Sequence, residues 1–93
     1  MDGSVQPRLA SHARLSRDRV TGDTVLLAPE TALTLNPTAV SILGLCDGER
    51  TLDEIVDHLA ARFDAPAGEL RGDVVQLLER LKAKGYIDGQ EAR

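Results

Sequence analysis

The stretch from residue 29 to residue 63 constrains the fold more than any other part of the chain. It contains a short strand pattern at Thr31–Leu35, which runs directly into Asn36 and Pro37. Asn is a favoured N-cap and Pro is favoured at the first helical position, so a helix is expected to begin there. The next positions are apolar over most of the helical circumference until Gly48, which suits the left-handed end of a helix. The pattern predicts a buried helix that is entered directly from a strand.

A second helix is predicted from Thr51, which forms a capping box with Glu54. Apolar residues then recur at helical spacing on one face. They are Leu52, Ile55, Val56, Leu59 and Phe63. A third helix is predicted from about Ala67 to Lys84, ended by Gly85.

Upstream of the first helix, the sequence predicts a small antiparallel meander. Residues 8–20 carry an edge-strand pattern, residues 25–28 a short strand, and Thr31–Leu35 the third strand, with turn signals between them. The fold class is therefore α+β in the order β-β-β-α-α-α, a three-stranded antiparallel sheet followed by three helices. With a short turn between the last two helices, this is a winged helix-turn-helix-like fold.

The chain of 93 residues is long enough for one small domain, which we place at residues 8–88. Residues 1–7 have no apolar periodicity and are expected to be a flexible tail or a linker remnant. Residues 89–93 are expected to be a second flexible tail.

The third helix carries more apolar residues than one core-facing stripe requires. The expected core stripe lies within an arc of about 60°. It consists of Leu70, Val74, Leu77 and Leu81. Beyond it lie Leu78 and Val75, with Arg71 and Lys82 on the same arc. Two interpretations stay open: peripheral core with a scattered surface valine, or a second apolar stripe, rimmed by cations, that faces a groove.

Thr31–Leu35 is the last strand before the helices and is expected to be a sheet edge. Exposed edges are usually protected by charges or Pro, and neither occurs within residues 31–35. An unprotected edge beside a spare apolar stripe is what peptide binding by strand addition needs. The alternative is that the edge pairs with a second copy of the chain.

Composition and side-chain inventory argue against an enzyme, a metalloprotein or a nucleic-acid-binding protein. The net charge of −4 is unfavourable for binding phosphates. Cys46 is expected to be buried, and His12 and His58 are too far apart for a metal-ligand pattern. We predict no catalytic residue, no metal and no cofactor. With no membrane-spanning run and no disulfide pair, the expected location is cytoplasmic.

The order and spacing of several motifs resemble one known family. The specific parts are NPTAVSIL at the start of the first helix and CDGERTLDEI at the joint between the first two helices. Together with LLAPETALTLN before them and DVVQLLERLKAKGYI after them, they are similar to PqqD, an accessory family of pyrroloquinoline quinone (PQQ) biosynthesis. The resemblance covers roughly residues 7–88.

The resemblance implies a non-catalytic peptide chaperone, a recognition element for ribosomally made, modified peptides. Such proteins bind the precursor peptide PqqA and deliver it to PqqE, a radical S-adenosylmethionine (SAM) enzyme, and some are fused to PqqC. The peptide is expected to dock as an added strand on the third strand, against the third helix. The implied peptide-binding residues are Thr31, Ala32, Leu33, Thr34, Leu35, Arg71, Val74, Val75, Leu78 and Lys82. A winged-helix DNA-binding protein and a non-catalytic dimerisation domain remain the alternatives.

Overall fold

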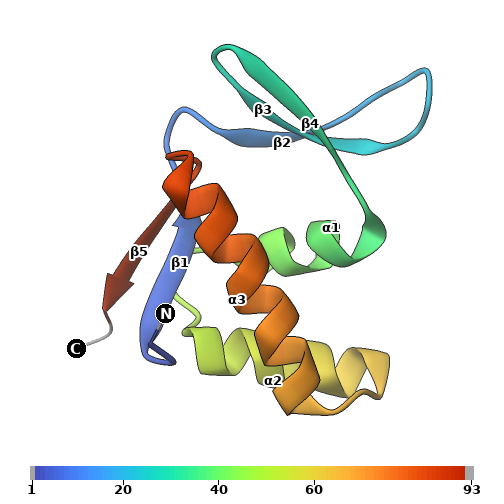
Figure 1. Cartoon of the computed structure of the whole chain (residues 1–93). Coiled ribbons are helices and arrows are strands. Elements are labelled where there is room, and N and C mark those ends of the chain that lie inside the picture. Colours follow the sequence, from blue (N-terminus) through green and yellow to red (C-terminus); the bar gives the residue numbers. More distant parts are fainter. Residues whose placement is uncertain (1, 92–93) are drawn as a thin grey trace.

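The computed structural model of the chain describes residues 2–91. Four strands, three helices and a last strand follow one another (Figure 1). The strands are β1 (Val5–Leu9), β2 (Arg14–Arg17), β3 (Thr24–Ala28), β4 (Thr31–Leu35) and β5 (Ile87–Glu91), and the helices are α1 (Pro37–Gly44), α2 (Leu52–Phe63) and α3 (Ala67–Ala83). The α+β class is confirmed, but the order β-β-β-α-α-α is wrong because one further strand lies at each end.

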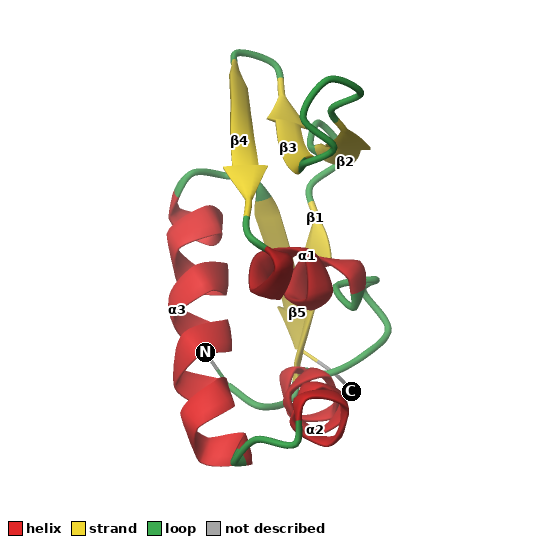
Figure 2. Cartoon of the chain, turned by 90° about the vertical axis from the view of Figure 1, so that its right-hand side faces the viewer, coloured by secondary structure: helices red, strands yellow, loops and turns green. Residues whose placement is uncertain are grey.

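The predicted three-stranded antiparallel meander is confirmed, with β3 between β2 and β4. Leu26 of β3 lies opposite Leu15 on one side and opposite Leu33 on the other. Leu26 has no exposed surface, so the middle strand anchors the sheet on the core. Figure 2 shows the meander at one end of the molecule, with α1 directly below β4.

A second sheet is formed by β1 and β5, so residues 5–7 and 89–91, which were expected to belong to flexible tails, lie in strands. β1 and β5 pair antiparallel, with Leu9 opposite Ile87. Ile87 is only 2% exposed, so β5 closes the hydrophobic core beside α3. Both strands are thus part of the folded domain.

Sequence reasoning missed this sheet because its pairing is non-local. Residues 5–9 alternate between apolar and polar side chains, but Pro7 is unfavourable inside a sheet, and Ile87 is the one large apolar residue of 87–91. Pro7 is tolerated in β1 because a strand at the edge of a sheet does not need every backbone donor. The other positions expected to be tails, 1 and 92–93, lie outside the described residues.

Helix α1 begins where the sequence predicts and ends about one turn early. The Asn36 side chain accepts a hydrogen bond from the backbone N–H of Ala39 at 2.7 Å. The helix ends at Gly44, so the prediction that Gly48 terminates it is wrong. Gly48 has a φ of 80° in the following turn, and its N–H donates to the carbonyl of Pro7 at 3.0 Å. Its left-handed conformation therefore brings the chain alongside β1.

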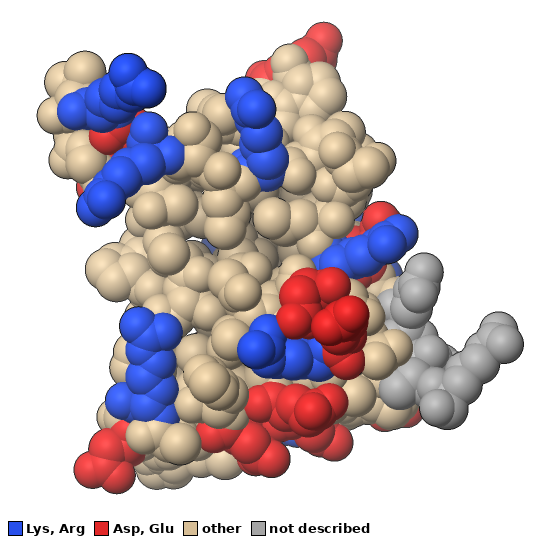
Figure 3. Space-filling model, turned by 180° about the vertical axis from the view of Figure 1, so that it is seen from behind, with Lys and Arg blue, Asp and Glu red and all other residues tan. Residues whose placement is uncertain are grey.

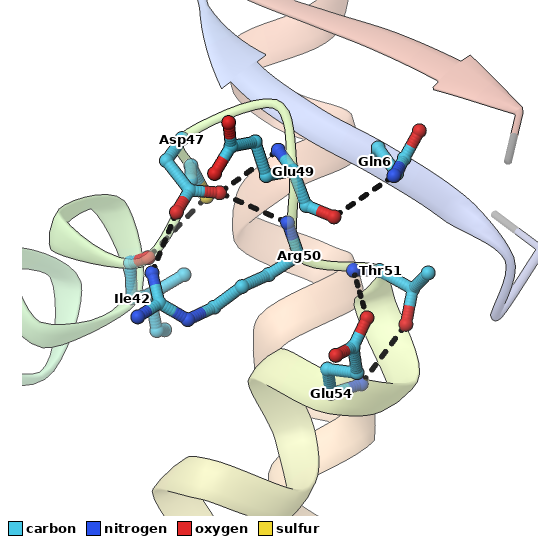
Figure 4. A network of polar contacts seen from close by, with 8 residues as sticks. Gln6, Ile42, Asp47, Glu49, Arg50, Thr51 and Glu54 are labelled. Atoms are coloured by element: carbon cyan, nitrogen blue, oxygen red, sulfur yellow. Dashed lines mark hydrogen bonds and ion pairs between the residues drawn. The ribbon is translucent and has the colours of Figure 1, made fainter.

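The joint between α1 and α2 is held by the carboxylate of Asp47 (Figure 4). Its Oδ1 accepts the backbone N–H groups of Glu49 and Arg50, both at 2.9 Å, and its Oδ2 accepts from the Arg50 guanidinium at 2.7 Å. The backbone hydrogen bonds from Arg50 and Glu49 lower the pKa of Asp47 below its ordinary value. Gln6 of β1 donates to the Glu49 carbonyl at 2.8 Å. This hydrogen bond connects the joint to β1 and so to the β1–β5 sheet.

The capping box of α2 is confirmed. The Thr51 hydroxyl accepts from the Glu54 N–H at 3.2 Å, and the Glu54 carboxylate accepts from the Thr51 N–H at 3.0 Å. Both bonds satisfy backbone donors that a helix start leaves free. The box fixes where α2 begins and so sets which face of the helix meets the core.

Replacing Thr51 with alanine is expected to lower the free energy of unfolding by about 1 kcal/mol, because an N-terminal amide of α2 loses its acceptor. Urea unfolding followed by circular dichroism measures the change. Thr51→Ser keeps the hydroxyl and is the matched control. An alanine variant as stable as the serine variant would contradict a stabilising role for the cap.

The core joins both sheets to all three helices and is almost wholly aliphatic. Its fully buried leucine, isoleucine and valine side chains come from β3, α2 and α3. They are Leu26, Leu52, Ile55, Leu59, Val74 and Leu78. Since α3 packs along α2 and also contacts β5, its rotation about its own axis decides which of its side chains remain outside the core.

Candidate functional site

The outer edge of β4 is unpaired within the described chain. The strand order is β2-β3-β4, so β4 has β3 on one side and no strand on the other. Ala28 and Thr31 face each other across the short turn between β3 and β4. Because hydrogen bonding alternates along an antiparallel pair, we expect Ala32 and Thr34 to direct their peptide groups outward. The edge prediction for this strand is confirmed.

The side chains of β4 alternate between two environments. Leu33 and Leu35 are half-buried and pack against the core, whereas Ala32 and Thr34 are exposed. Alternate residues of a strand point to opposite faces, so the two leucines share the face turned toward α3. β4 therefore offers a row of backbone groups with an apolar row beside it.

A cavity of about 260 Å³ lies between β4 and the C-terminal half of α3. Its apolar lining comes from Leu33 and Leu35 on the strand and from Leu77 and Leu81 on the helix. Its other lining residues are Thr34, Asn36, Ala39, Arg80 and Lys84. Figure 2 shows this end of α3 beside the C-terminal end of β4.

A second cavity of about 270 Å³ continues from the first toward the middle of α3. The two share Asn36, Ala39 and Leu77, and the second adds Asp73 of α3. Together they form one trough, which runs from β4 over the start of α1. We call it the β4–α3 groove.

Two of the site residues predicted on α3 lie in the core instead. Val74 and Leu78 are both 0% exposed. Leu78 is therefore not part of a spare stripe, and Leu77, which was expected in the core, lines the groove. The sequence predicts Leu77 in the core and Leu78 outside it, which is the reverse of their positions in the structure. The two leucines are hard to distinguish from the sequence, because the apolar residues of α3 cover a wider arc than the helix buries.

The other predicted residues of α3 lie on the opposite flank from the groove. At 100° per residue, Arg71, Val75 and Lys82 fall about 60–100° to one side of Val74, and the groove residues fall on the other side. The Arg71 guanidinium lies 2.5 Å from the Asp53 carboxylate of α2, so it faces that helix. None of the three lines the groove. An ion pair as exposed as Arg71–Asp53 contributes at most about 1 kcal/mol to stability.

Sequence reasoning missed Leu77, Arg80 and Lys84 as groove residues. Their spacing was a usable signal, since positions i, i+3 and i+7 lie on one face of a helix. The spacing does not show which face of α3 is turned toward β4. That face is set by packing between distant parts of the chain.

The thiol of Cys46, the single cysteine of the chain, is buried in the core. Cys46 is 6% exposed, its thiol donates to the Ile42 carbonyl at 3.3 Å, and burial raises its pKa to about 12. Within residues 2–91, no group of three or more His, Cys, Asp or Glu side chains could hold a metal ion. No described helix is long and apolar enough to cross a membrane. The β4–α3 groove is the candidate site, because it lies beside the unpaired edge of β4.

Comparison with known proteins gives a consistent result. Residues 23–87, more than half of the chain, match the family model of coenzyme PQQ synthesis protein D (PqqD). The PqqA binding protein of Rhizobium meliloti strain 1021 is 41% identical over 88 residues, covering 95% of this chain and 90% of that protein. The PqqA binding protein of Rhodopseudomonas palustris strain TIE-1 is 44% identical over 82 residues, covering 88% and 80%.

Two solved structures resemble this one. The first is the solution structure of the PqqD truncation of Methylobacterium extorquens PqqCD, described as a functional, stand-alone recognition element for ribosomally synthesised and post-translationally modified peptides. It has a TM-score of 0.79 and 36% identity, covering 94% of this chain and 93% of that one. The second is crystalline PqqD from Xanthomonas campestris, with a TM-score of 0.57 and 39% identity, covering 82% and 84%.

Proposed function

This chain belongs to the PqqD family, and we propose on that premise that it is a peptide chaperone of PQQ biosynthesis that binds the precursor peptide PqqA. Relatives named PqqA binding protein and the recognition-element structure support this function. The observation that carries the mode of binding is the unpaired outer edge of β4 beside the groove.

An extended peptide can join the sheet by pairing with β4. Its backbone would bond to the outward peptide groups of Ala32 and Thr34, and alternate side chains would enter the β4–α3 groove. Backbone bonds supply affinity for almost any extended segment, whereas the groove supplies selectivity. The proposed site on the strand is the whole of Thr31–Leu35, as the sequence predicts.

On α3 the proposed site is Leu77, Arg80 and Lys84, in place of the five residues expected from the sequence. Leu77 supplies apolar contact at the centre of the groove. Arg80 and Lys84 are both exposed at its β4 end. Val74 and Leu78 contribute indirectly, because they fix the helix against the core.

We propose PqqE as the enzyme that receives the bound peptide, and PqqC as a protein with which the domain can associate. PqqE follows from the family resemblance, because a chaperone without chemistry of its own must hand its peptide to an enzyme. PqqC follows from the Methylobacterium relative, which was cut from a PqqCD chain. A cytoplasmic, non-catalytic role fits a chain whose single cysteine is buried.

We infer that the helical part is of winged helix-turn-helix type, because α2 and α3 are joined by a short connection at residues 64–66. This resemblance does not favour DNA binding. The net charge is −4, and Figure 3 shows Lys and Arg interrupted by Asp and Glu on the face opposite to that of Figure 1. A phosphate backbone needs a continuous cationic surface.

Titration of the protein with synthetic PqqA in a calorimeter tests the function. We expect saturable binding with one peptide per chain and a negative heat-capacity change, because apolar surface is buried in the groove. A scrambled peptide of the same composition is the control. Binding of PqqA no tighter than of the scrambled peptide would contradict the proposal.

A further inference from the structure

The β4–α3 groove has an ordered distribution of charge. Its β4 end carries the cations Arg80 and Lys84, with no carboxylate in the lining of that cavity. Its α1 end carries Asp73, with no cation in the lining of the second cavity. One side of α3 therefore presents positive charge near the strand and negative charge about two turns earlier.

The two cations are available to a ligand. Within the described part of the chain, the ion pairs are Arg50–Asp47 and Arg71–Asp53, and neither Arg80 nor Lys84 takes part in one. Both side chains are exposed at the rim, where a bound peptide would partly screen them from water. A charge-assisted hydrogen bond in such a place is stronger than one in open solvent.

The apolar part of the groove lies directly beside these cations. Leu33, Leu35, Leu77 and Leu81 line the same cavity as Arg80 and Lys84. Residues of an added strand that face α3 are two positions apart, about 7 Å along the strand. One such side chain can sit among the leucines while the next reaches the cations.

We propose that the groove selects an acidic segment of its peptide, in which a large apolar side chain and a carboxylate lie two residues apart on the face turned toward α3. Arg80 and Lys84 bind the carboxylate, and the leucines hold the apolar side chain. Asp73 repels a carboxylate at the other end, so the charge order fixes the direction in which the segment lies. This inference rests on the proposed peptide-binding function and adds the chemistry that the site recognises.

The test compares three variants that each remove one positive charge from α3. Arg80→Gln and Lys84→Gln remove a cation of the groove, whereas Lys82→Gln removes one from the opposite flank of the same helix. We expect each groove variant to weaken PqqA binding about threefold to tenfold at low salt, and less at high salt. Lys82→Gln should change the affinity for PqqA by no more than about twofold, because it alters only the overall charge of the protein.

A set of PqqA peptides, each with a single Asp or Glu replaced by its amide, identifies the carboxylate. One of these peptides should bind the wild-type protein more weakly than unmodified PqqA does. On the Arg80→Gln/Lys84→Gln double variant, the same peptide and unmodified PqqA should bind equally well, because the partners of the carboxylate are gone. Thermal unfolding of every variant checks that the fold is kept.

The outcomes separate this inference from the function on which it rests. If PqqA binds the wild type but Arg80→Gln, Lys84→Gln and Lys82→Gln behave alike, the proposed charge selectivity is overturned and the chaperone function stands. The proposed charge selectivity is also overturned if no amide-substituted peptide shows a loss of affinity that depends on Arg80 and Lys84. If PqqA does not bind the wild type at all, both fail.

Discussion

The Leu78→Ala variant is expected to lose about 2–5 kcal/mol of unfolding free energy, which is a large part of the stability of a small domain. Leu78 is 0% exposed and belongs to the core cluster that joins α3 to α2 and β5. Removing its side chain leaves a cavity lined by neighbours that cannot close it fully. Urea unfolding at equilibrium measures the loss, and a folded baseline must still be visible.

Leu77→Ala is the matched comparison, since it removes the same atoms one residue earlier. Leu77 is half-buried on the groove side of α3, so we expect a smaller loss of stability and a larger loss of PqqA binding. If Leu77→Ala is instead the less stable variant, then Leu77 rather than Leu78 faces the core, as the sequence pattern predicts.

The Thr34→Pro variant is expected to lose PqqA binding by at least about tenfold while it remains folded. Proline removes the outward N–H of Thr34, and its ring obstructs the backbone of an added strand. Proline is tolerated on the outer side of an edge strand, and the preceding Leu33 is already extended, so the meander should survive. Calorimetric titration measures the affinity.

Thr34→Ala is the control, because it removes the hydroxyl and keeps the N–H. If both Thr34 variants bind PqqA as the wild type does, the peptide does not pair with this edge. Circular dichroism of the proline variant must match the wild type before a loss of binding is attributed to the missing donor.

Local signals predicted the helix starts well because each lies within a few residues. The Asn36 side chain and the Thr51–Glu54 box make the hydrogen bonds that their spacing implies. Thr31–Leu35 has the predicted bounds, since a turn signal precedes it and a helix cap follows. These features depend little on the rest of the molecule.

Two features could not be predicted because they depend on distant contacts. β1 and β5 form a sheet only by pairing with each other, and they lie far apart in the sequence. Pro7 also argues against a strand at residues 5–9 when the sequence is considered alone. The exchange of Leu77 and Leu78 reflects a modest rotation of α3, which is set by packing on α2 and β5. Leu33, Thr34 and Leu35 of the predicted strand residues thus line the groove, whereas Val74 and Leu78 of the predicted helix residues lie in the core.

The most direct test of the account is an NMR titration of isotope-labelled protein with unlabelled PqqA, followed by intermolecular contacts to labelled methyl groups. We expect amide shifts along Thr31–Leu35 and peptide contacts to the methyls of Leu33 and Leu77, with none to Val75. Contacts to Val75 without contacts to Leu77 would place the peptide on the other flank of α3. Such a result, or shifts that spare β4, would contradict docking in the β4–α3 groove.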